Sequence, residues 1–561
     1  MTVPGIRFIS PSAPISGPGS RADIAMFVGT ISRTMASLPA GQRDALVRQG
    51  WIGSAAVGPN ESEAKAQARL AREAALLGIP VAVESWSAFE QLYAINSKPV
   101  EAGSPDRIAC ALGLAVHSFF AEGGRRAYIV RTGDPYPLVD ISEGAGTFRA
   151  RKKALLDWKA ADAPADAAGR VPLLPGFTNF ANQPDPGTRS TWAGMAAIFG
   201  IEDAAMLLLP DLIELCAGAP APVAFIPEPL GPDEQFKDCA PALPAAIPAT
   251  RPGRPSWRAP RLDKNGYALW ARATRHAIDT LGRPTGPGHR RDVMLVGAAP
   301  LPSPESGYDK GEERNPLQVL ERDGAAITKQ SLFDNSLAGS ARLQLAYPWV
   351  TTAQSLGQPE AIQSPEGVMA GIMARTAMQH GAFHSCAGQK PVSVQGVVPE
   401  LTGAELANGS QGSKESWLGD RLSLIGRRYG EITLLSDATT ANSRAWQVGG
   451  VSRLMGIILR GARHLGQDLM FEPSGQQIWA RLEGMFRSFL EGLRQKNAFE
   501  GFTPADCYDV RCDRSTMSQN DIDNGRIIAQ ISFSPAYPVE RITVSLALTQ
   551  PASAAQQQRA A

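Results

Sequence analysis

The C-terminal part of the chain combines a long amphipathic helix with strand-like runs, and this combination restricts the fold more than any other feature. Apolar residues recur every three or four positions between Gln476 and Phe499, which is the spacing of one buried helix face. The pattern therefore predicts a helix that packs against a core along most of its length. The apolar positions are Ile478, Trp479, Leu482, Met485, Phe486, Phe489, Leu490 and Leu493.

Two strand-like runs follow this helix, at 526–533 and at 541–548. The second run alternates apolar and polar residues, so one set of side chains shares a single strand face. A strand near a chain end can add to the sheet of another molecule as readily as to its own. We therefore expect an inter-subunit linking strand whose apolar face consists of Ile542, Val544, Leu546 and Leu548.

Residues 1–21 have the composition of an arm. A short strand-like run is followed by Pro11, Pro14 and Pro18, which exclude a helix and interrupt any sheet ladder. Taken alone, the sequence leaves two interpretations equally open: a frayed terminus, and an extended arm that becomes ordered on a neighbouring subunit. In the second interpretation the N-terminal linking strand is Ile6, Arg7, Phe8 and Ile9.

Residues 22–139 alternate between strand and helix patterns. Ala22–Ile31 predicts a buried strand, Pro105 the start of a helix, and Arg125–Arg131 a returning strand. Ser87 with Glu90 has the spacing of a capping box at another helix start. This alternation is typical of a mixed α/β core layer.

Residues 140–340 are less regular and contain segments rich in Pro and Ala, which predict loops or linkers. Compact pieces between these loops predict a strand, a helix and a strand, in the order of a βαβ-like middle domain. The pieces are 206–211, 267–281 and 292–296.

Several strings of residues resemble contractile tail sheath proteins, which build the sheaths of contractile phage tails and of related bacterial injection systems. The C-terminal strings are Phe471-Glu-Pro473, Trp479-Ala-Arg481, Phe489-Leu-x-Gly492-Leu493, Cys512-Asp513-Arg514-x-Thr-Met517 and Asp521-Ile-Asp-x-Gly525-Arg526. The others are Ser85-Trp86-x-x-Phe89, Phe119-Phe120-x-x-Gly123-Gly124 and Pro365-x-Gly367 through Thr376. The family-motif core residues are therefore Trp86, Phe89, Phe120, Gly124, Trp479, Phe489, Asp513, Met517 and Gly525.

The resemblance implies an inner α/β core built from both the N- and C-terminal parts, with the middle inserted on the outside. The implied domains are an arm at 1–21, core parts at 22–139 and 341–540, an outer domain at 140–340, and a linking strand with a tail at 541–561. The implied partners are further copies of the chain in a helical polymer, an inner tail tube protein, and baseplate and tail terminator proteins. Assembly is expected in the cytoplasm of the producing bacterium, before incorporation into a virion tail or an injection-system particle.

Composition is consistent with these expectations. The formal net charge of +1 argues against a nucleic-acid surface, which needs a basic excess or patch. The chain has no apolar run of about twenty residues, and its first twenty residues lack the pattern of a signal peptide. The six cysteines are scattered without a Cys-x-x-Cys pair, as expected for small buried residues in a reducing compartment.

Chemical motifs are weak throughout. His380, His384 and Cys386 have the spacing nearest to a metal site, but Gly381 interrupts the helix that would align them. No nucleophile elbow or phosphate loop occurs, so we expect no catalytic residue, cofactor or metal. Two alternatives remain: a cytoplasmic α/β enzyme with a Pro-rich insertion, and a non-contractile tube or scaffold protein.

Overall fold

The computed structural model describes residues 21–537 except for a set of internal segments. The expected linking strands at 6–9 and 541–548 lie outside the described residues, and so does Gly525. The internal segments not described are 54–62, 141–143, 158–169, 180–182, 223–256, 283–288, 309, 321–340, 404, 406–417, 442, 468, 470–474 and 525.

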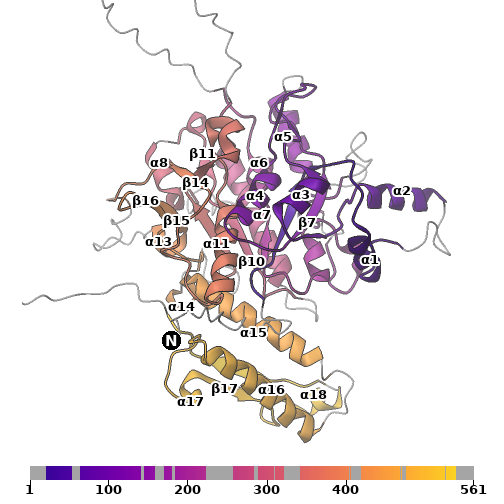
Figure 1. The fold of residues 1–561 in the computed structure, drawn as a ribbon, viewed down its shortest axis with the longest axis vertical. Helices are drawn as coiled ribbons and strands as arrows, with labels where there is room; N and C mark the ends of the chain where they lie inside the picture. Colours follow the sequence, from indigo (N-terminus) through magenta and orange to yellow (C-terminus); the bar gives the residue numbers. More distant parts are fainter. Residues whose placement is uncertain are drawn as a thin grey trace, which may run out of the picture.

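One eight-stranded sheet forms the centre of the molecule (Figure 1). Its order is β16-β15-β12-β10-β8-β1-β7-β3, and every pair is parallel except the antiparallel pairs at the two ends, β15–β16 and β3–β7. The strands are β1 (Ala25–Thr30), β3 (Val81–Val83), β7 (Ala127–Gly133), β8 (Met206–Leu208), β10 (Met294–Ala298), β12 (Leu343–Tyr347), β15 (Ser423–Arg428) and β16 (Glu431–Leu434).

Helices cover both faces of this sheet, which is why the central strands are continuous apolar runs. On one face α4 (Ala111–Ala121) packs against α11 (Glu366–Gln379). On the other face lie α6 (Leu212–Cys216), α7 (Lys264–Gly282) and the 3-10 turn η4 (Gly194–Gly200). The mixed α/β class expected from the sequence is confirmed.

The middle of the chain belongs to this sheet. Strands β8 and β10, both from residues 140–340, lie between β1 and β12 and contribute to its two apolar layers. The boundaries at 140 and 340 therefore do not separate a middle domain from the core at these strands. The Pro- and Ala-rich stretches mark connections that leave the sheet and return to it, and such connections have the composition of linkers without being domain boundaries.

Two helix starts differ from the sequence prediction. The helix expected at Ser87 is α3 (Trp86–Leu92), and its cap is Ser85, whose hydroxyl accepts from the Ala88 amide at 3.1 Å. The helix expected at Pro105 begins at Ala111 after Cys110, whose sulfur accepts from the Gly113 amide at 3.4 Å. Residues near Pro105 instead form a short strand pair, so proline there marks a turn and not a first helical residue.

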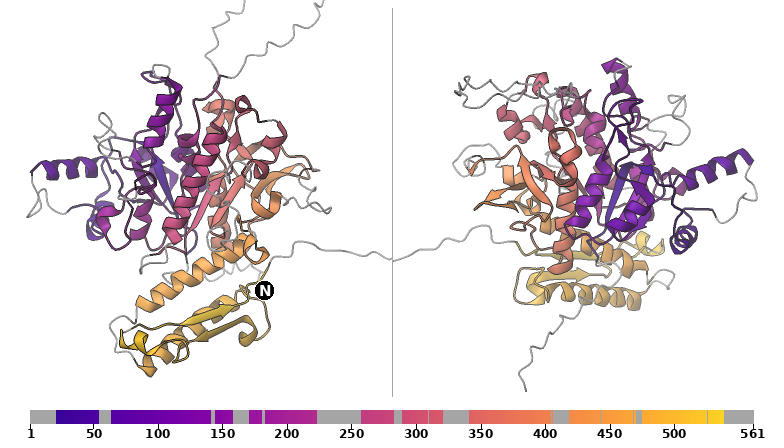
Figure 2. Two further views of the ribbon diagram at one scale, coloured as in Figure 1. Left: turned by 180° about the vertical axis from the view of Figure 1, so that it is seen from behind. Right: turned by 45° about the horizontal axis from the view of Figure 1, so that its top comes forward.

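Residues 449–537 form a separate unit on one side of the sheet, which we call the C-terminal unit (Figure 2). It consists of α15 (Gly449–Gln467), α16 (Gln476–Arg494), α17 (Pro504–Cys507), β17 (Tyr508–Arg511), α18 (Gln519–Asp523) and β18 (Gln530–Phe533). The expected C-terminal part of the core, 341–540, is thus divided between the sheet and this unit.

The remaining elements lie in the connections. They are α1 (Ala40–Arg48), α2 (Glu63–Ala74), α5 (Ala145–Ala154), α8 (Lys310–Arg314), α9 (Pro316–Val319), α13 (Leu418–Arg421), α14 (Arg444–Gln447), and the short strands β2 (Ser32–Arg33), β4 (Tyr93–Ala94), β5 (Lys98–Pro99), β6 (Arg107–Ile108), β9 (Arg261–Leu262), β11 (Leu301–Pro302), β13 (Trp349–Thr352) and β14 (Val394–Val398). In the views of Figures 1 and 2, α2 projects from the side of the molecule.

Candidate assembly site

The C-terminal unit contains the longest run of predicted family-motif residues and has its own apolar core. In α16, the predicted buried face is confirmed: Trp479, Leu482, Phe486, Leu490 and Leu493 are all buried. Its first helical residue is Gln476 and its cap is Gly475, without a side-chain hydrogen bond. The apolar partners of α16 are α15 and the strand β17.

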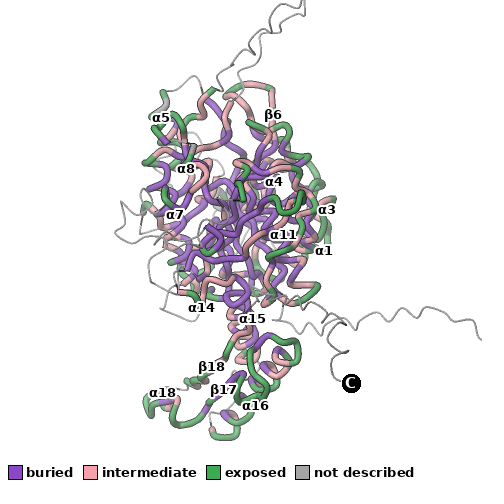
Figure 3. The backbone as a smooth tube through the Cα atoms, turned by 90° about the vertical axis from the view of Figure 1, so that its left-hand side faces the viewer, coloured by how far each residue is buried: buried purple, intermediate pink, exposed green. Residues whose placement is uncertain are grey.

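Helix α15 connects this unit to the sheet and has two different faces. Leu454, Ile457 and Ile458 belong to the core of the C-terminal unit. The arginines at 453, 460 and 463 point to the sheet instead, and Arg453 and Arg460 are almost fully buried. Figure 3 shows that the backbone is buried where α15 meets the main body and more exposed in the rest of the unit. The unit is therefore held together internally by apolar groups, and it is joined to the main body by buried polar groups as well as by apolar contacts that include Ala205 and Ala382.

The first polar attachment is a network around Asp437. Arg453 donates to both carboxylate oxygens of Asp437, from Nη2 at 2.6 Å and from Nη1 at 3.0 Å. The same carboxylate accepts from the Gln344 amide side chain at 2.7 Å and from the Cys386 backbone amide at 2.8 Å. Burial alone would raise the pKa of Asp437, but the Arg453 guanidinium outweighs burial and holds that pKa below its ordinary value.

The second attachment is a cluster of arginines around Asp292. Arg463 of α15 donates to Asp292 Oδ1 at 2.8 Å, and Arg290 donates to both carboxylate oxygens at 3.1 Å. Arg460 of α15 donates to the Asp292 backbone carbonyl at 2.8 Å. Burial would raise the pKa of Asp292, but the arginines, Arg290 first, hold it far below the ordinary range. One buried carboxylate thus balances positive charge from both the sheet and α15.

Glycines allow α15 to approach both of its partners closely. A Cβ on Gly456 would lie 2.8 Å from the Asp292 carbonyl oxygen, on the side of the sheet. A Cβ on Gly461 would lie 2.5 Å from the ring of Phe489 in α16. The predicted motif residue Phe489 therefore serves as the contact between the two long helices of the unit.

The small sheet of the C-terminal unit has two strands in the described part of the chain. Tyr508 to Arg511 of β17 pair antiparallel with Phe533 to Gln530 of β18. Tyr508 and Val510 face α16 and are buried, and Arg487 of α16 donates to the Val510 carbonyl at 2.8 Å. Each strand has one edge without a further strand among the described residues.

Both ends of the described chain lie at this unit. Ala22, just before β1, is buried in the same apolar core as Trp479 and Phe486. At the other end, Phe533 of β18 packs against that core, and Tyr537 is the last described residue. The described chain therefore both begins and ends at the C-terminal unit.

The other predicted motif residues have structural roles. Trp86 stacks on Phe89 at 5.1 Å between ring centroids, and Phe120 contacts Phe119 at 5.4 Å. Gly124 lies against the Phe119 ring, where no Cβ fits. Met517 is buried in the C-terminal unit.

Asp513 is exposed and orders the turn after β17. Its carboxylate accepts from the Ser515 amide at 2.7 Å and from the Ser515 hydroxyl, and the hydroxyl first of all lowers its pKa. The turn leads to α18, where Ser518 and Asp521 form a capping box.

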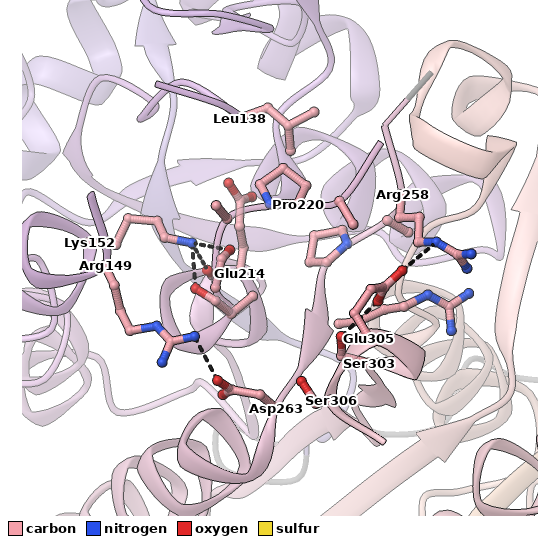
Figure 4. A pocket seen from close by; sticks show the side chains of 17 residues that line it. Leu138, Arg149, Lys152, Glu214, Pro220, Arg258, Asp263, Ser303, Glu305 and Ser306 are labelled. Carbon is pink, nitrogen blue, oxygen red and sulfur yellow. Dashed lines mark hydrogen bonds and ion pairs between the residues drawn. The ribbon is translucent and has the colours of Figure 1, made fainter. Parts of the chain in front are cut away.

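A cavity of 260 Å³ lies among α5, α6 and residues 258–263 and 303–306 (Figure 4). Its charged side chains neutralise each other or bind backbone. Lys152 Nζ donates to the carbonyls of Glu214, Ala217 and Gly218 at 2.6–3.1 Å, while Arg149 pairs with Asp263 at 2.7 Å. No histidine or cysteine is among the described residues that line it.

The rings of His380 and His384 lie 6.0 Å apart between centroids, but Cys386 does not complete a three-ligand site with them. The helix α11 ends at Gln379, His380 follows as its cap, and Cys386 is fully buried beneath the Asp437 network. Burial raises the pKa of the Cys386 thiol to about 12. Within the described ranges, no group of three His, Cys, Asp or Glu residues has the geometry to hold a metal ion.

No helix in the described part of the chain is both long enough and apolar enough to cross a membrane.

Sequence reasoning missed the polar face of α15 entirely. The signal was present: Arg453 and Arg460 stand seven residues apart in the helix, which places both on one face, beside the apolar stripe. Their partners Asp292 and Asp437 come from distant strand ends, and a single sequence does not connect such positions.

No protein-family model matches the chain, and no curated protein matches its sequence. Among solved structures, a chain of the anti-feeding prophage (AFP) baseplate in its contracted state aligns with a TM-score of 0.53 at 15% identity, covering 98% of this chain and 99% of that one. A chain of the six-fold symmetrised AFP baseplate aligns with a TM-score of 0.50 at 15% identity, covering 98% and 100%. The sheath complex of the PVC extracellular contractile injection system, in its contracted state, gives 0.49 at 14% identity over 98% of each chain.

The likeness to the AFP chains runs over nearly the whole length of both proteins and concerns the fold. The mixed α/β class expected from the sequence is confirmed, and these AFP chains share the fold.

Proposed function

We propose that the chain is a subunit of a contractile tail sheath. In this role it polymerises helically around an inner tube and contracts to drive that tube through a target cell envelope. The observation that carries the proposal is the shared fold, over 98% of the chain, with a subunit of a contractile particle, the AFP baseplate in its contracted state. The proposed partners are further copies of the chain, the inner tail tube protein, and baseplate and tail terminator proteins.

The C-terminal unit supports a linking mechanism for this polymer. Each strand of its two-stranded sheet has one edge without a further strand among the described residues, and the described chain begins and ends at this unit. Strands of neighbouring subunits, 6–9 and 541–548, would add to this sheet through backbone hydrogen bonds. Each bond contributes only about 1 kcal/mol net, so the strands tether neighbours while leaving the subunit bodies free to rotate.

Contraction in this mechanism needs no nucleotide. The extended lattice is metastable, and the contracted lattice buries more surface or pairs more charges between the bodies. The subunits assemble in the cytoplasm of the producing bacterium and then act in a virion tail or an injection-system particle. Nothing in the proposal requires contact with nucleic acid or insertion into a membrane.

Negative-stain electron microscopy of the purified full chain tests the proposal. Hollow tubes with a helical surface, present in a long narrow form and a shorter wider form, are expected. Tubes of a single fixed pitch would favour the non-contractile scaffold, and closed oligomers of a few subunits would favour the enzyme interpretation. Either result would contradict a contractile sheath.

A further inference from the structure

A small cavity lies at the carboxyl ends of the central parallel strands. It has 30 Å³ and extends from the end of β8 past β10 to β12, beneath α7. Thr274 of α7 lines it from one face of the sheet, and Glu366, the first residue of α11, reaches it although α11 packs on the other face. The remaining lining residues are uncharged: Leu209, Pro210, Leu212, Ile213, Trp270, Leu295, Val296, Gly297, Ala298, Leu343 and Leu345.

Two buried polar atoms from residues that line this cavity have no hydrogen-bond partner among the described residues. Glu366 is 2% exposed; its Oε1 accepts from the Ser364 hydroxyl at 2.7 Å, whereas its Oε2 has no partner. Thr274 is also 2% exposed, and its Oγ1 has no partner. Leaving a buried polar group unsatisfied costs roughly 1–3 kcal/mol, so two such atoms in one cavity require an explanation.

The space and the chemistry fit water. A cavity needs about 10–15 Å³ to hold one water molecule, and a buried water needs polar partners. The cavity exceeds this volume, and its carboxyl and hydroxyl groups come from two different helices. An empty cavity of this size would be expected only with an apolar lining.

The surroundings also disfavour a charge on Glu366. An ionised carboxylate with one oxygen unsolvated in an apolar cavity is strongly disfavoured, and the group neutralises instead. The titratable group that acts on it is Asp211, itself buried, whose carboxylate accepts from the Thr30 amide at 2.5 Å and the Thr30 hydroxyl at 2.7 Å. Burial raises the pKa of Asp211 itself to about 6. Burial foremost, with a smaller contribution from Asp211, raises the pKa of Glu366 to about 7.

We propose that this cavity binds a water molecule that bridges the Glu366 carboxyl to the Thr274 hydroxyl, and that Glu366 is held there as the neutral acid. The neutral carboxyl donates from Oε2 to the water, and Oε1 keeps its bond from Ser364. The water joins α11 to α7 around the carboxyl edge of the sheet. The site is thus an internal proton-binding site that links the two helix layers of the main body.

The consequence is a stability that depends on pH. Between the ordinary glutamate value of 4.5 and about 7, the folded chain binds this proton more tightly than the unfolded chain. The stabilisation is therefore complete below about pH 4.5 and is lost as pH rises through 7. The folding equilibrium should fall by roughly a hundredfold across this interval.

Unfolding of the full-length, unassembled chain, measured between pH 5 and 8 with and without the substitution E366Q, tests whether Glu366 holds a proton in the folded chain. E366Q should lose this pH-dependent component and gain stability relative to the unmodified chain as pH rises. An infrared band of a protonated carboxyl, present at pH 6 in the unmodified chain and absent from E366Q, is also expected. An unchanged pH profile together with the absence of that band would overturn the neutral acid. D211N separates the contribution of the neighbouring carboxyl.

High-resolution density maps of the unmodified chain and of the variants T274V and T280V test whether the cavity holds the proposed water. Thr280 lies on the same helix, is equally buried and also lacks a partner for Oγ1, but it does not line the cavity. Density between Glu366 and Thr274 should be present in the unmodified chain and in T280V, and absent from T274V. An empty cavity in the unmodified chain, or density unaffected by T274V, would overturn the water site. These tests use single subunits, so their failure and a failure to form tubes are separate results.

Discussion

Arg453 and Asp437 form a bidentate ion pair, with Nη2–Oδ2 and Nη1–Oδ1 distances of 2.6 and 3.0 Å, at the point where the C-terminal unit meets the central sheet. Side-chain exposure is 4% for Arg453 and 1% for Asp437, so water does not screen the pair. Bidentate guanidinium–carboxylate pairs fix orientation as well as distance. The pair therefore sets the direction in which α15 leaves the main body, and with it the placement of the two-stranded sheet.

Replacing Asp437 by Asn should destabilise the chain by about 3–5 kcal/mol, because the substitution leaves the Arg453 charge buried without its counter-ion. The free energy of unfolding in urea measures this loss. If the linking mechanism holds, D437N should also fail to form tubes at temperatures where it remains folded, because the C-terminal unit is no longer held in one orientation.

The pair between Arg427 and Glu400 provides a matched control. Its Nε–Oε1 distance is 2.7 Å, but its side chains are 47% and 58% exposed. E400Q should change the free energy of unfolding by less than about 1 kcal/mol, as exposed ion pairs do. Equal effects of D437N and E400Q would contradict the role assigned to burial.

Helix α16 and strands β1 and β7 could be predicted from the sequence because burial on one side leaves a regular apolar pattern. Two features could not. Cys110 caps α4 with its sulfur, which is not among the usual capping side chains, so Pro105 was the stronger local signal and was wrong. Strands β8 and β10 were recognised as buried strands, but their places beside β1 and β12 depend on pairings between residues far apart in the chain.

In the candidate site, too, some residues could be predicted from the sequence and others could not. Phe489 and Trp479 follow the apolar period and were predicted, whereas Asp292 and Asp437 also pair with arginines of α15 that are 171 and 16 residues away in sequence. The free energy of such a buried pair depends on all the groups that surround it. The identity of a single residue in the sequence does not reveal those groups.

Replacing Gly461 by Ala should separate α15 from α16. The new methyl group would lie 2.5 Å from the Phe489 ring, so the helices must shift, at a cost of about 1–3 kcal/mol. Thermal unfolding measures the change. The double variant G461A/F489L should recover part of the loss, because the smaller side chain makes room for the methyl group.

Gly484 in α16 is the control for G461A, because a Cβ there meets nothing within 4 Å. G484A should stabilise the chain by roughly 0.5–1 kcal/mol through helix propensity alone. Stabilisation by G461A of the same size would show that α15 and α16 are not closely packed at Phe489.

Acid should detach the C-terminal unit before it unfolds the sheet. Asp292 and Asp437 have pKa values below the ordinary aspartate value of 3.8, because arginines outweigh the effect of burial on each. Their stabilisation is present above that ordinary value and is lost as pH falls through the lower folded values. Hydrogen exchange measured at decreasing pH should show α15 losing protection before β10 and β12. Simultaneous loss throughout the chain would argue against two separately stabilised parts.

Deleting residues 1–20 or 541–561 should leave a folded monomer that forms no tubes. Folding should persist because the core of the C-terminal unit is built from described residues, starting at Ala22, and neither deletion removes any of them. Assembly should fail because each deletion removes one strand that would pair with a neighbour's sheet. Circular dichroism and sedimentation measure folding and size, and electron microscopy measures tube formation.

Deleting only 549–561 keeps the strand 541–548 and should preserve assembly. Tubes formed by either longer deletion would show that the arms do not link the subunits.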